Sequence, residues 1–154
     1  VEVSKELLRL PGHPFDGVKA TLAKLRDTGR YRMVVFTKGE LLDQENKFHR
    51  SGLRPYFDDI VIVSEKTPDA YNRLCKQFGV KIGQLLMVGD SYPEDIAPVL
   101  EIGGWAVHIP NDMDSEDIEY LNKIHPHLLR LSRFAELIEF LSPYPRLIDK
   151  SILS

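Results

Sequence analysis

Four polar side chains in this sequence follow short apolar runs, at spacings that suit phosphate and metal chemistry. Thr37 and Lys66 come after two runs rich in β-branched residues, and Asp90 follows a third run with Asp95 five positions later. Carboxylates are hard oxygen ligands, and Mg²⁺ usually takes one or two of them while keeping several waters. A hydroxyl and an ammonium group can both bind phosphoryl oxygens. We therefore expect one site that holds a phosphate group and a divalent cation.

Three neighbouring residues, Lys38, Gly39 and Ser91, are candidates for further phosphate contacts. The segment after Thr37 leads into a predicted helix, whose first backbone N–H groups can bind an anion. Each signal is weak by itself, because a threonine that ends a strand most often has no chemical role and a lysine before a helix is most often solvated. The order of one Thr, one Lys and then two Asp after successive strands is far less frequent by chance.

The elements that must position these residues are four nearly continuous apolar runs, at 33–36, 60–63, 85–88 and 106–109. Continuous runs of this kind are typical of parallel strands that are covered on both faces. Helical patterns lie between them, with glycines as stops at 29, 52, 79 and 103–104. Thr67 and Pro68 suit the start of one helix. Leu41, Leu42, Glu45 and Phe48 are expected on one side of another. The alternation predicts an α/β fold with a parallel sheet and right-handed crossovers, and ligands bind beyond the carboxyl ends of such strands.

Together these segments resemble the motifs of the haloacid dehalogenase superfamily. The run 34–39 is similar to the second motif, a strand that ends in Ser or Thr, and Lys66 to the lysine of the third motif. The segment 86–96 resembles the fourth motif, which holds the metal, and 104–110 resembles the strand that usually follows. The resemblance spans roughly residues 15–141. It implies a Rossmann-like core with helices on both faces, a Mg²⁺ cofactor and hydrolysis of phosphate monoesters through an aspartyl-phosphate.

The first motif of that superfamily is an Asp-x-Asp pair that carries the nucleophile, and no such pair precedes Thr37. The one Asp-x-Asp spacing, Asp112-Met113-Asp114, lies late in a polar stretch that we interpret as surface. The resemblance thus implies a nucleophile outside this chain. It also implies three segments: the end of a helical cap with its return linker at 1–14, a catalytic core without its first strand at 15–141, and a tail at 142–154.

The absent first strand belongs in the middle of the sheet. Without it, residues 34–37 and 85–89 would expose unpaired backbone groups, and burying such groups costs roughly 1–3 kcal/mol each. A domain has a net stability of only about 5–15 kcal/mol. We therefore expect an upstream strand, a second copy of the chain in a homodimer, or a rearranged segment to fill the gap. We also expect that residues 1–154 alone are not a stable, active monomer.

The composition of the chain indicates which kinds of partner to expect. The formal net charge of −3 gives no general reason to bind nucleic acid or an anionic membrane surface, and no apolar run approaches the roughly 20 residues that span a bilayer. The single cysteine, Cys75, excludes an internal disulfide and favours a reducing, cytoplasmic location, with Cys75 as a packing residue. The expected partner is a small phosphorylated substrate, which the sequence does not identify.

Two other functions remain open. Carbon–halogen hydrolysis in the same superfamily needs no metal, and the pair Asp90 and Asp95 argues against it. A non-catalytic protein that binds phosphorylated ligands or serves as a scaffold fits the absent first motif, although it gives the four polar residues no purpose. A receiver-type signalling domain has its acidic residues before its Thr and Lys, which is the reverse of the order here. Among the aromatic residues and histidines, we expect Phe36, Trp105 and a hydrogen-bonded His108 in the core, and Tyr92, His125 and His127 at the surface.

Overall fold

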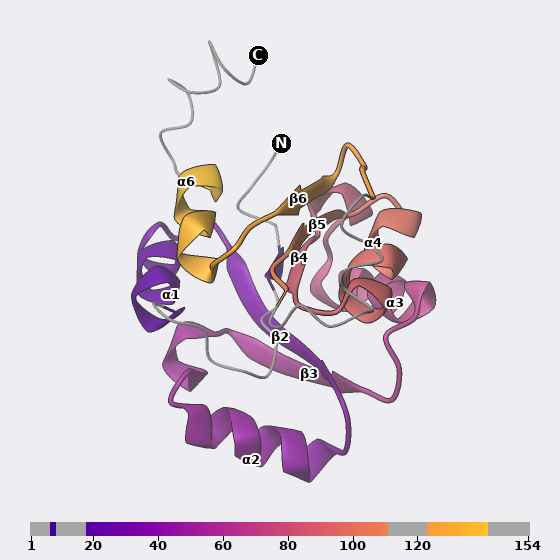
Figure 1. The fold of residues 1–154 in the computed structure, drawn as a ribbon. Helices are drawn as coiled ribbons and strands as arrows, with labels where there is room; N and C mark the ends of the chain where they lie inside the picture. Colours follow the sequence, from indigo (N-terminus) through magenta and orange to yellow (C-terminus); the bar gives the residue numbers. More distant parts are fainter. Residues whose placement is uncertain (1–6, 9–17, 111–122, 142–154) are drawn as a thin grey trace.

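The computed structural model describes residues 7–8, 18–110 and 123–141 of the chain (Figure 1). The strands are β1 (Leu7–Leu8), β2 (Arg32–Lys38), β3 (Asp59–Val63), β4 (Leu86–Gly89), β5 (Trp105–His108) and β6 (Leu128–Arg130). The α-helices are α1 (Val18–Asp27), α2 (Leu41–Ser51), α3 (Pro68–Phe78), α4 (Ala97–Glu101) and α6 (Leu137–Leu141). Short 3-10 turns are η2 (Arg54–Tyr56), η3 (Ile82–Gln84) and η5 (Phe134–Glu136), and η4 (Tyr92–Ile96) is a π-helical turn. The four predicted apolar runs form β2, β3, β4 and β5.

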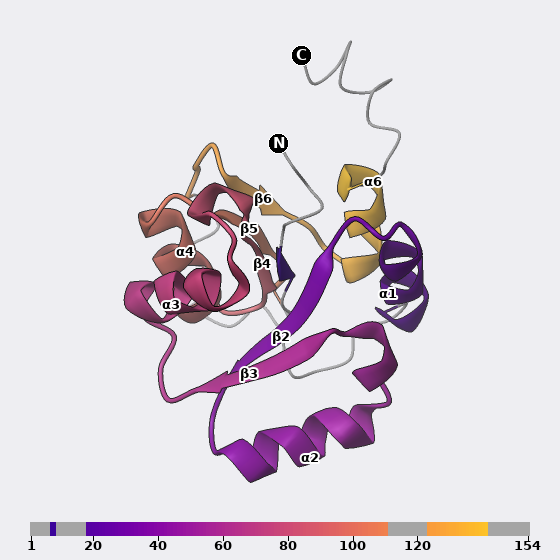
Figure 2. The same ribbon diagram turned by 180° about the vertical axis from the view of Figure 1, so that it is seen from behind.

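All strand pairs that the structure describes are parallel, and they form two three-stranded sheets in the orders β1-β2-β3 and β4-β5-β6. β1 pairs with Arg32 and Met33 at the start of β2, and it also lies beside β4 (Figure 2). A short segment from the start of the chain therefore stands at the place where the two sheets meet. The parallel, Rossmann-like α/β fold expected from the sequence is confirmed.

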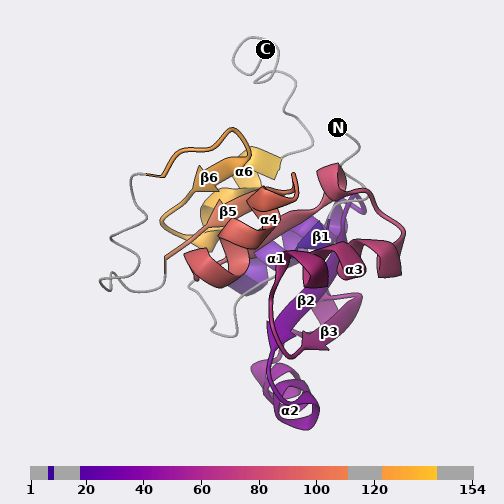
Figure 3. The ribbon, with the colours of Figure 1, turned by 90° about the vertical axis from the view of Figure 1, so that its right-hand side faces the viewer.

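The core has two parts, one on each face of the strands. On β2, Met33 and Val35 lie in one cluster, while Val34 and Phe36 lie in the other, as expected because successive side chains of a strand point to opposite faces. The first cluster includes residues of α1, η5 and α6, and the second includes residues of α3 and α4 (Figure 3). Helices thus cover both faces, which explains why the strands read as continuous apolar runs.

The predicted helix ends are confirmed at several positions. The Thr67 side chain accepts a hydrogen bond from the Ala70 N–H at 3.1 Å, with Pro68 as the first residue of α3. Gly52 and Gly79 end α2 and α3 with left-handed φ values of 77° and 66°, a conformation that glycine adopts without steric cost. The helix expected to open near Pro93 begins instead with the π-helical turn η4 before α4.

The apolar residues of α2 differ in their exposure. Leu41 and Leu42 have exposed fractions of 56% and 65%, and Phe48 is the buried residue of the helix. α2 lies outside β3 at the edge of the fold (Figure 1), and all five residues of β3 are half-buried. An edge position leaves part of the helix without a surface to pack against, and helical spacing alone does not report this.

Three sequence predictions fall on residues outside the described ranges: the tail at 142–154, the spacing Asp112-Met113-Asp114, and most of the segment 1–14. The assignment of 1–14 to a cap and linker stays a prediction, as does the expected instability of residues 1–154 alone. No helix in the described part of the chain is both long and apolar enough to cross a membrane.

Candidate functional site

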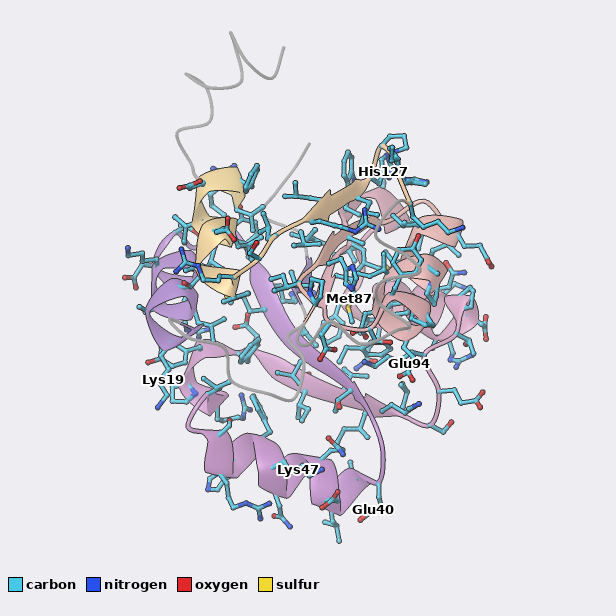
Figure 4. All side chains as sticks on the ribbon, in the orientation of Figure 1. Lys19, Glu40, Lys47, Met87, Glu94 and His127 are labelled. Carbon is cyan, nitrogen blue, oxygen red and sulfur yellow. The ribbon has the colours of Figure 1, made fainter. Side chains whose placement is uncertain are left out.

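The predicted site residues come from the carboxyl ends of β2 and β4 and from the connection between β3 and α3. Thr37 and Lys38 are the last residues of β2, Lys66 stands two residues before α3, and Asp90 directly follows β4. The segment 90–96, which includes η4, is called the acidic turn here because it contains Asp90, Glu94 and Asp95. Figure 4 shows Glu94 at the end of the β4–β6 sheet opposite to His127.

Lys66 and Asp95 form a buried ion pair. The distance from Nζ of Lys66 to Oδ1 of Asp95 is 2.7 Å, and the side chains are 4% and 1% exposed. The second oxygen of Asp95, Oδ2, accepts a hydrogen bond from the Ser91 N–H at 3.2 Å. A Cβ atom on Gly89 would overlap with the Asp95 carboxylate, so only glycine fits at that position of β4. The structure therefore brings Lys66 and Asp95 together at the carboxyl edge of the sheets.

The acidic turn is held by hydrogen bonds within it and from neighbouring elements. The Asp95 N–H donates to the Ser91 carbonyl at 2.8 Å, and the Glu94 N–H donates to Oγ of Ser91 at 3.4 Å. From α3, the Tyr71 hydroxyl donates to the Glu94 carbonyl at 2.9 Å. From β5, Nε2 of His108 lies 3.1 Å from the Asp90 carbonyl oxygen. Because several elements restrain its backbone, the turn can present side chains in fixed directions.

Asp90 is half-buried, and none of the described residues forms an ion pair or hydrogen bond with its carboxylate. Among the described residues, no three His, Cys, Asp or Glu side chains gather as a metal site. This donor set fits Mg²⁺, which binds through one or two carboxylates together with waters and substrate phosphate. It does not suit a metal that needs a cage of four protein ligands. The predicted second ligand, Asp95, already has Lys66 and the Ser91 amide as partners, and its direct ligation of a metal stays a prediction.

The Thr37 hydroxyl, predicted to bind a phosphoryl oxygen, has a partner in the protein. Its hydroxyl donates to Oε1 of Gln44 at 3.2 Å. The N–H of Gly39 donates to the Val63 carbonyl at 3.1 Å, and the carboxylate of Glu40 accepts from the Leu42 N–H at 2.7 Å. These backbone donors thus have acceptors in the protein, and the phosphate contact expected at Gly39 stays a prediction. A carboxylate at the cap position satisfies the start of α2 instead.

Lys38 reaches across the carboxyl edge from β2 to the acidic turn. Its Nζ lies 3.0 Å from Oε2 of Glu94, and both side chains are partly exposed. This pair and the pair of Lys66 with Asp95 connect the β1-β2-β3 half of the fold to the acidic turn. Sequence reasoning missed Gln44 and Tyr71, because residues inside a helix give no signal of a polar contact with a distant strand or turn.

The predictions for the other aromatic residues and for His108 are confirmed in part. Phe36 is buried, and His108 is a fully buried, hydrogen-bonded core residue, as predicted. Tyr92, expected at the surface, is 9% exposed and packs edge-on against His108 with ring centroids 5.8 Å apart. Trp105 is half-buried: it packs against the first core cluster, and its ring stacks on His127 with centroids 3.8 Å apart.

Cys75 is buried on α3, which confirms it as a packing residue. Loss of hydration on burial raises the pKa of its thiol from 9.0 to about 11. The neutral thiol is therefore the stable form of Cys75 at physiological pH. It takes no part in the site.

Comparison with known proteins gives consistent matches. A family model described as haloacid dehalogenase-like hydrolase matches residues 2–103. The chain is 34% identical over 93 residues to N-acylneuraminate-9-phosphatase of Mus musculus, covering 57% of this chain and 37% of that protein. It is 31% identical over 114 residues to glyceraldehyde 3-phosphate phosphatase of Methanocaldococcus jannaschii, covering 70% and 50%. The chain thus spans half or less of the length of these two relatives.

Solved structures agree on the fold. A haloacid dehalogenase-like family hydrolase from Xanthomonas campestris superposes with a TM-score of 0.69 at 31% identity, over 88% of this chain and 51% of that one. A phosphatase of the same superfamily from Thermococcus onnurineus gives a TM-score of 0.68 at 26% identity, over 83% and 58%.

Proposed function

Because the chain belongs to the haloacid dehalogenase-like hydrolase family, we propose that it forms most of the catalytic core of a Mg²⁺-dependent phosphate-monoester hydrolase. The observation that supports this best is the buried pair of Lys66 and Asp95, in the same turn as Asp90, whose carboxylate has no partner among the described residues. One positive charge and one anionic metal ligand at a single edge suit a phosphoryl group with its cation. The phosphatase names of the relatives support the same reaction class.

In this proposal, an aspartate outside this chain attacks phosphorus. An O–P bond to its carboxylate forms, the ester P–O bond breaks, and the leaving oxygen takes a proton from a second acid outside this chain, so that it departs as the alcohol. Water then attacks the aspartyl-phosphate, which releases inorganic phosphate and restores the carboxylate. When bound, Mg²⁺ would stabilise charge on the phosphoryl oxygens. The substrate would be a small phosphorylated metabolite, as in the relatives' names.

Each candidate site residue would have a distinct role in that reaction. Lys66 would place its ammonium group against the phosphoryl oxygens, and Asp95 keeps that group charged and oriented, because a buried lysine without a counter-charge tends to lose its proton. Asp90 would bind the cation. The Thr37 hydroxyl, which donates to Gln44 in the structure, would rotate to donate to a phosphoryl oxygen. Lys38 and Ser91 stand at the edge of the same site as further candidate contacts.

A panel of small phosphate monoesters, assayed with the purified native protein, tests the function. We expect phosphate release that requires Mg²⁺ and stops with a chelator. Asp90→Asn should lower turnover at least a hundredfold, in the range for loss of a major electrostatic contact. Asp69→Asn is the matched control, because Asp69 is an exposed aspartate on α3 that pairs with Arg73.

The same assay separates the two other functions. A dehalogenase would release halide from haloacids without a metal. A non-catalytic binding protein would bind phosphorylated ligands without turnover. Either result, with no phosphate released from any monoester, would contradict the proposal.

A further inference from the structure

Two buried side chains from outside the acidic turn hold one backbone carbonyl near each end of it. The Tyr71 hydroxyl donates to the Glu94 carbonyl at 2.9 Å, and Nε2 of His108 donates to the Asp90 carbonyl at 3.1 Å. Both side chains are fully buried, Tyr71 on α3 and His108 at the end of β5. The acidic turn is therefore fixed from two different elements.

The π-helical conformation of the turn explains why these two hydrogen bonds matter. A π-helical turn is rare and occurs frequently at functional sites. η4 leads straight into α4, so the backbone has a competing, ordinary helical arrangement available. A hydrogen bond at each end favours the observed arrangement. That arrangement turns Asp95 inward to Lys66 and leaves the Asp90 carboxylate free of protein partners among the described residues.

The register of β4 and β5 places His108 next to Asp90, the proposed metal ligand. Gly89 is paired with His108 across β4 and β5, and the Ile109 N–H donates to the Gly89 carbonyl at 2.9 Å. His108 thus continues the strand pairing by one residue, using its side chain where β4 has ended. The Asp90 backbone is held at the point where its side chain leaves the sheet.

We propose that Tyr71 and His108 are positioning residues for the divalent cation: by holding the carbonyls of Glu94 and Asp90, they set the direction of the Asp90 carboxylate. Neither side chain binds the metal itself. The inference rests on the proposed function, in which Asp90 is a metal ligand. Outer groups that orient metal ligands typically change metal affinity 10–100-fold when they are removed.

A second tyrosine in the same protein provides a matched control. The Tyr31 hydroxyl donates to the Leu141 carbonyl at 2.8 Å, and Tyr31 is also buried. Tyr31→Phe removes the same kind of hydrogen bond as Tyr71→Phe, but between the residue before β2 and the end of α6, away from the acidic turn. If Tyr71 served stability alone, the two variants would behave alike.

The first measurement needs no metal. Amide hydrogen exchange is followed across residues 89–96 of the metal-free native protein. We expect faster exchange in Tyr71→Phe and His108→Leu, a partial return in His108→Gln, which keeps an N–H donor, and no change there in Tyr31→Phe. Exchange in the turn that is equal in Tyr71→Phe and Tyr31→Phe would overturn the inference.

The second measurement is a titration with Mn²⁺, followed by electron paramagnetic resonance as a stand-in for Mg²⁺. We expect Asp90→Asn to abolish tight binding and Tyr71→Phe to weaken it about tenfold or more, with Tyr31→Phe within twofold of wild type. If Asp90→Asn weakens binding and Tyr71→Phe does not, the positioning role is refuted and the metal site stands. If Asp90→Asn has no effect, the metal assignment in the proposed function is itself wrong.

Discussion

Asp95 holds Lys66 through an ion pair of 2.7 Å in which both side chains are almost completely buried. A lysine and an aspartate each lose much of their hydration in such a position, and the loss is offset only while both remain paired. The pair also joins two parts of the fold, because Lys66 precedes α3 and Asp95 belongs to the acidic turn after β4. In the proposed reaction, turnover and stability would therefore depend on the same contact.

Removing the negative charge should destabilise the protein strongly. Asp95→Asn leaves the Lys66 ammonium in a buried place without its carboxylate, and breaking one side of a buried pair costs roughly 3–5 kcal/mol. Asp43→Asn serves as the control, because Asp43 pairs with Lys47 on the exposed surface of α2 and such a pair contributes only about 0.3–0.5 kcal/mol. Urea unfolding of the two variants measures the difference. Similar, small losses in both would show that the buried pair is not a stabilising contact.

Lys66 should matter for turnover separately from its effect on stability. Lys66→Met should lower kcat by about 10²–10³, the scale for loss of one positioned charge in a water-poor site. The double variant Lys66→Met with Asp95→Asn removes both buried charges, and it should recover stability relative to Lys66→Met without recovering activity. Lys76→Met, at an exposed position of α3, is the control. Recovery of activity in the double variant would mean that Lys66 acts only through folding.

Gly89 should not tolerate a methyl group. Gly89→Ala places Cβ against the Asp95 carboxylate, which Lys66 and the Ser91 amide hold in place. Overpacking of this kind costs about 1–3 kcal/mol, and it should also disturb the acidic turn and lower turnover. Gly83→Ala is the comparison, because nothing lies within 4 Å of a Cβ atom at Gly83. Thermal melting and phosphatase assays of both variants decide; an unchanged melting temperature in Gly89→Ala would contradict the packing described here.

The raised pKa of Cys75 predicts a loss of stability in alkaline solution. The pKa of the folded thiol is about 11, against an ordinary 9.0. The contribution is therefore complete below about pH 9 and is lost as the pH rises towards 11, by about 3 kcal/mol in total. The stability difference between wild type and Cys75→Ala should shrink over that range, and Cys75 should react slowly with a thiol reagent at pH 8. Rapid reaction of the folded protein at pH 8 would rule out a buried thiol.

Much of the fold could be predicted from local sequence. The strands at 33–36 and 85–88 read as continuous apolar runs because their alternate residues face two separate clusters. The helix ends at Gly52 and Gly79 follow from a backbone conformation that glycine adopts easily. The spacing of apolar residues does not indicate that Leu41 and Leu42 are exposed, because their exposure depends on where α2 lies relative to the edge strand.

The position of the candidate site residues at one edge of the strands was predictable from the sequence, and the contacts that hold the acidic turn were not. Thr37, Lys66, Asp90 and Asp95 follow successive strands, so their order alone indicates a shared edge. Contacts such as Tyr71 with the Glu94 carbonyl join residues 23 positions apart through one hydroxyl group. Nothing in the residue type of a buried tyrosine tells which carbonyl it will reach. The π-helical form of η4 was equally hidden, because its residues also suit an α-helix.

In many enzymes, replacing a catalytic residue raises stability, since activity is maintained at the expense of a strained or electrostatically unfavourable site. In the proposed reaction, the acidic turn would reverse that relation. Lys66 and Asp95 neutralise each other, and together with the pair of Lys38 and Glu94 they connect two three-stranded sheets at one edge. If the proposed function holds, substitutions at these positions would lower both the reaction rate and the amount of folded protein. Directed evolution of this scaffold should therefore begin at exposed positions such as Leu41 and Leu42, which belong to neither ion pair.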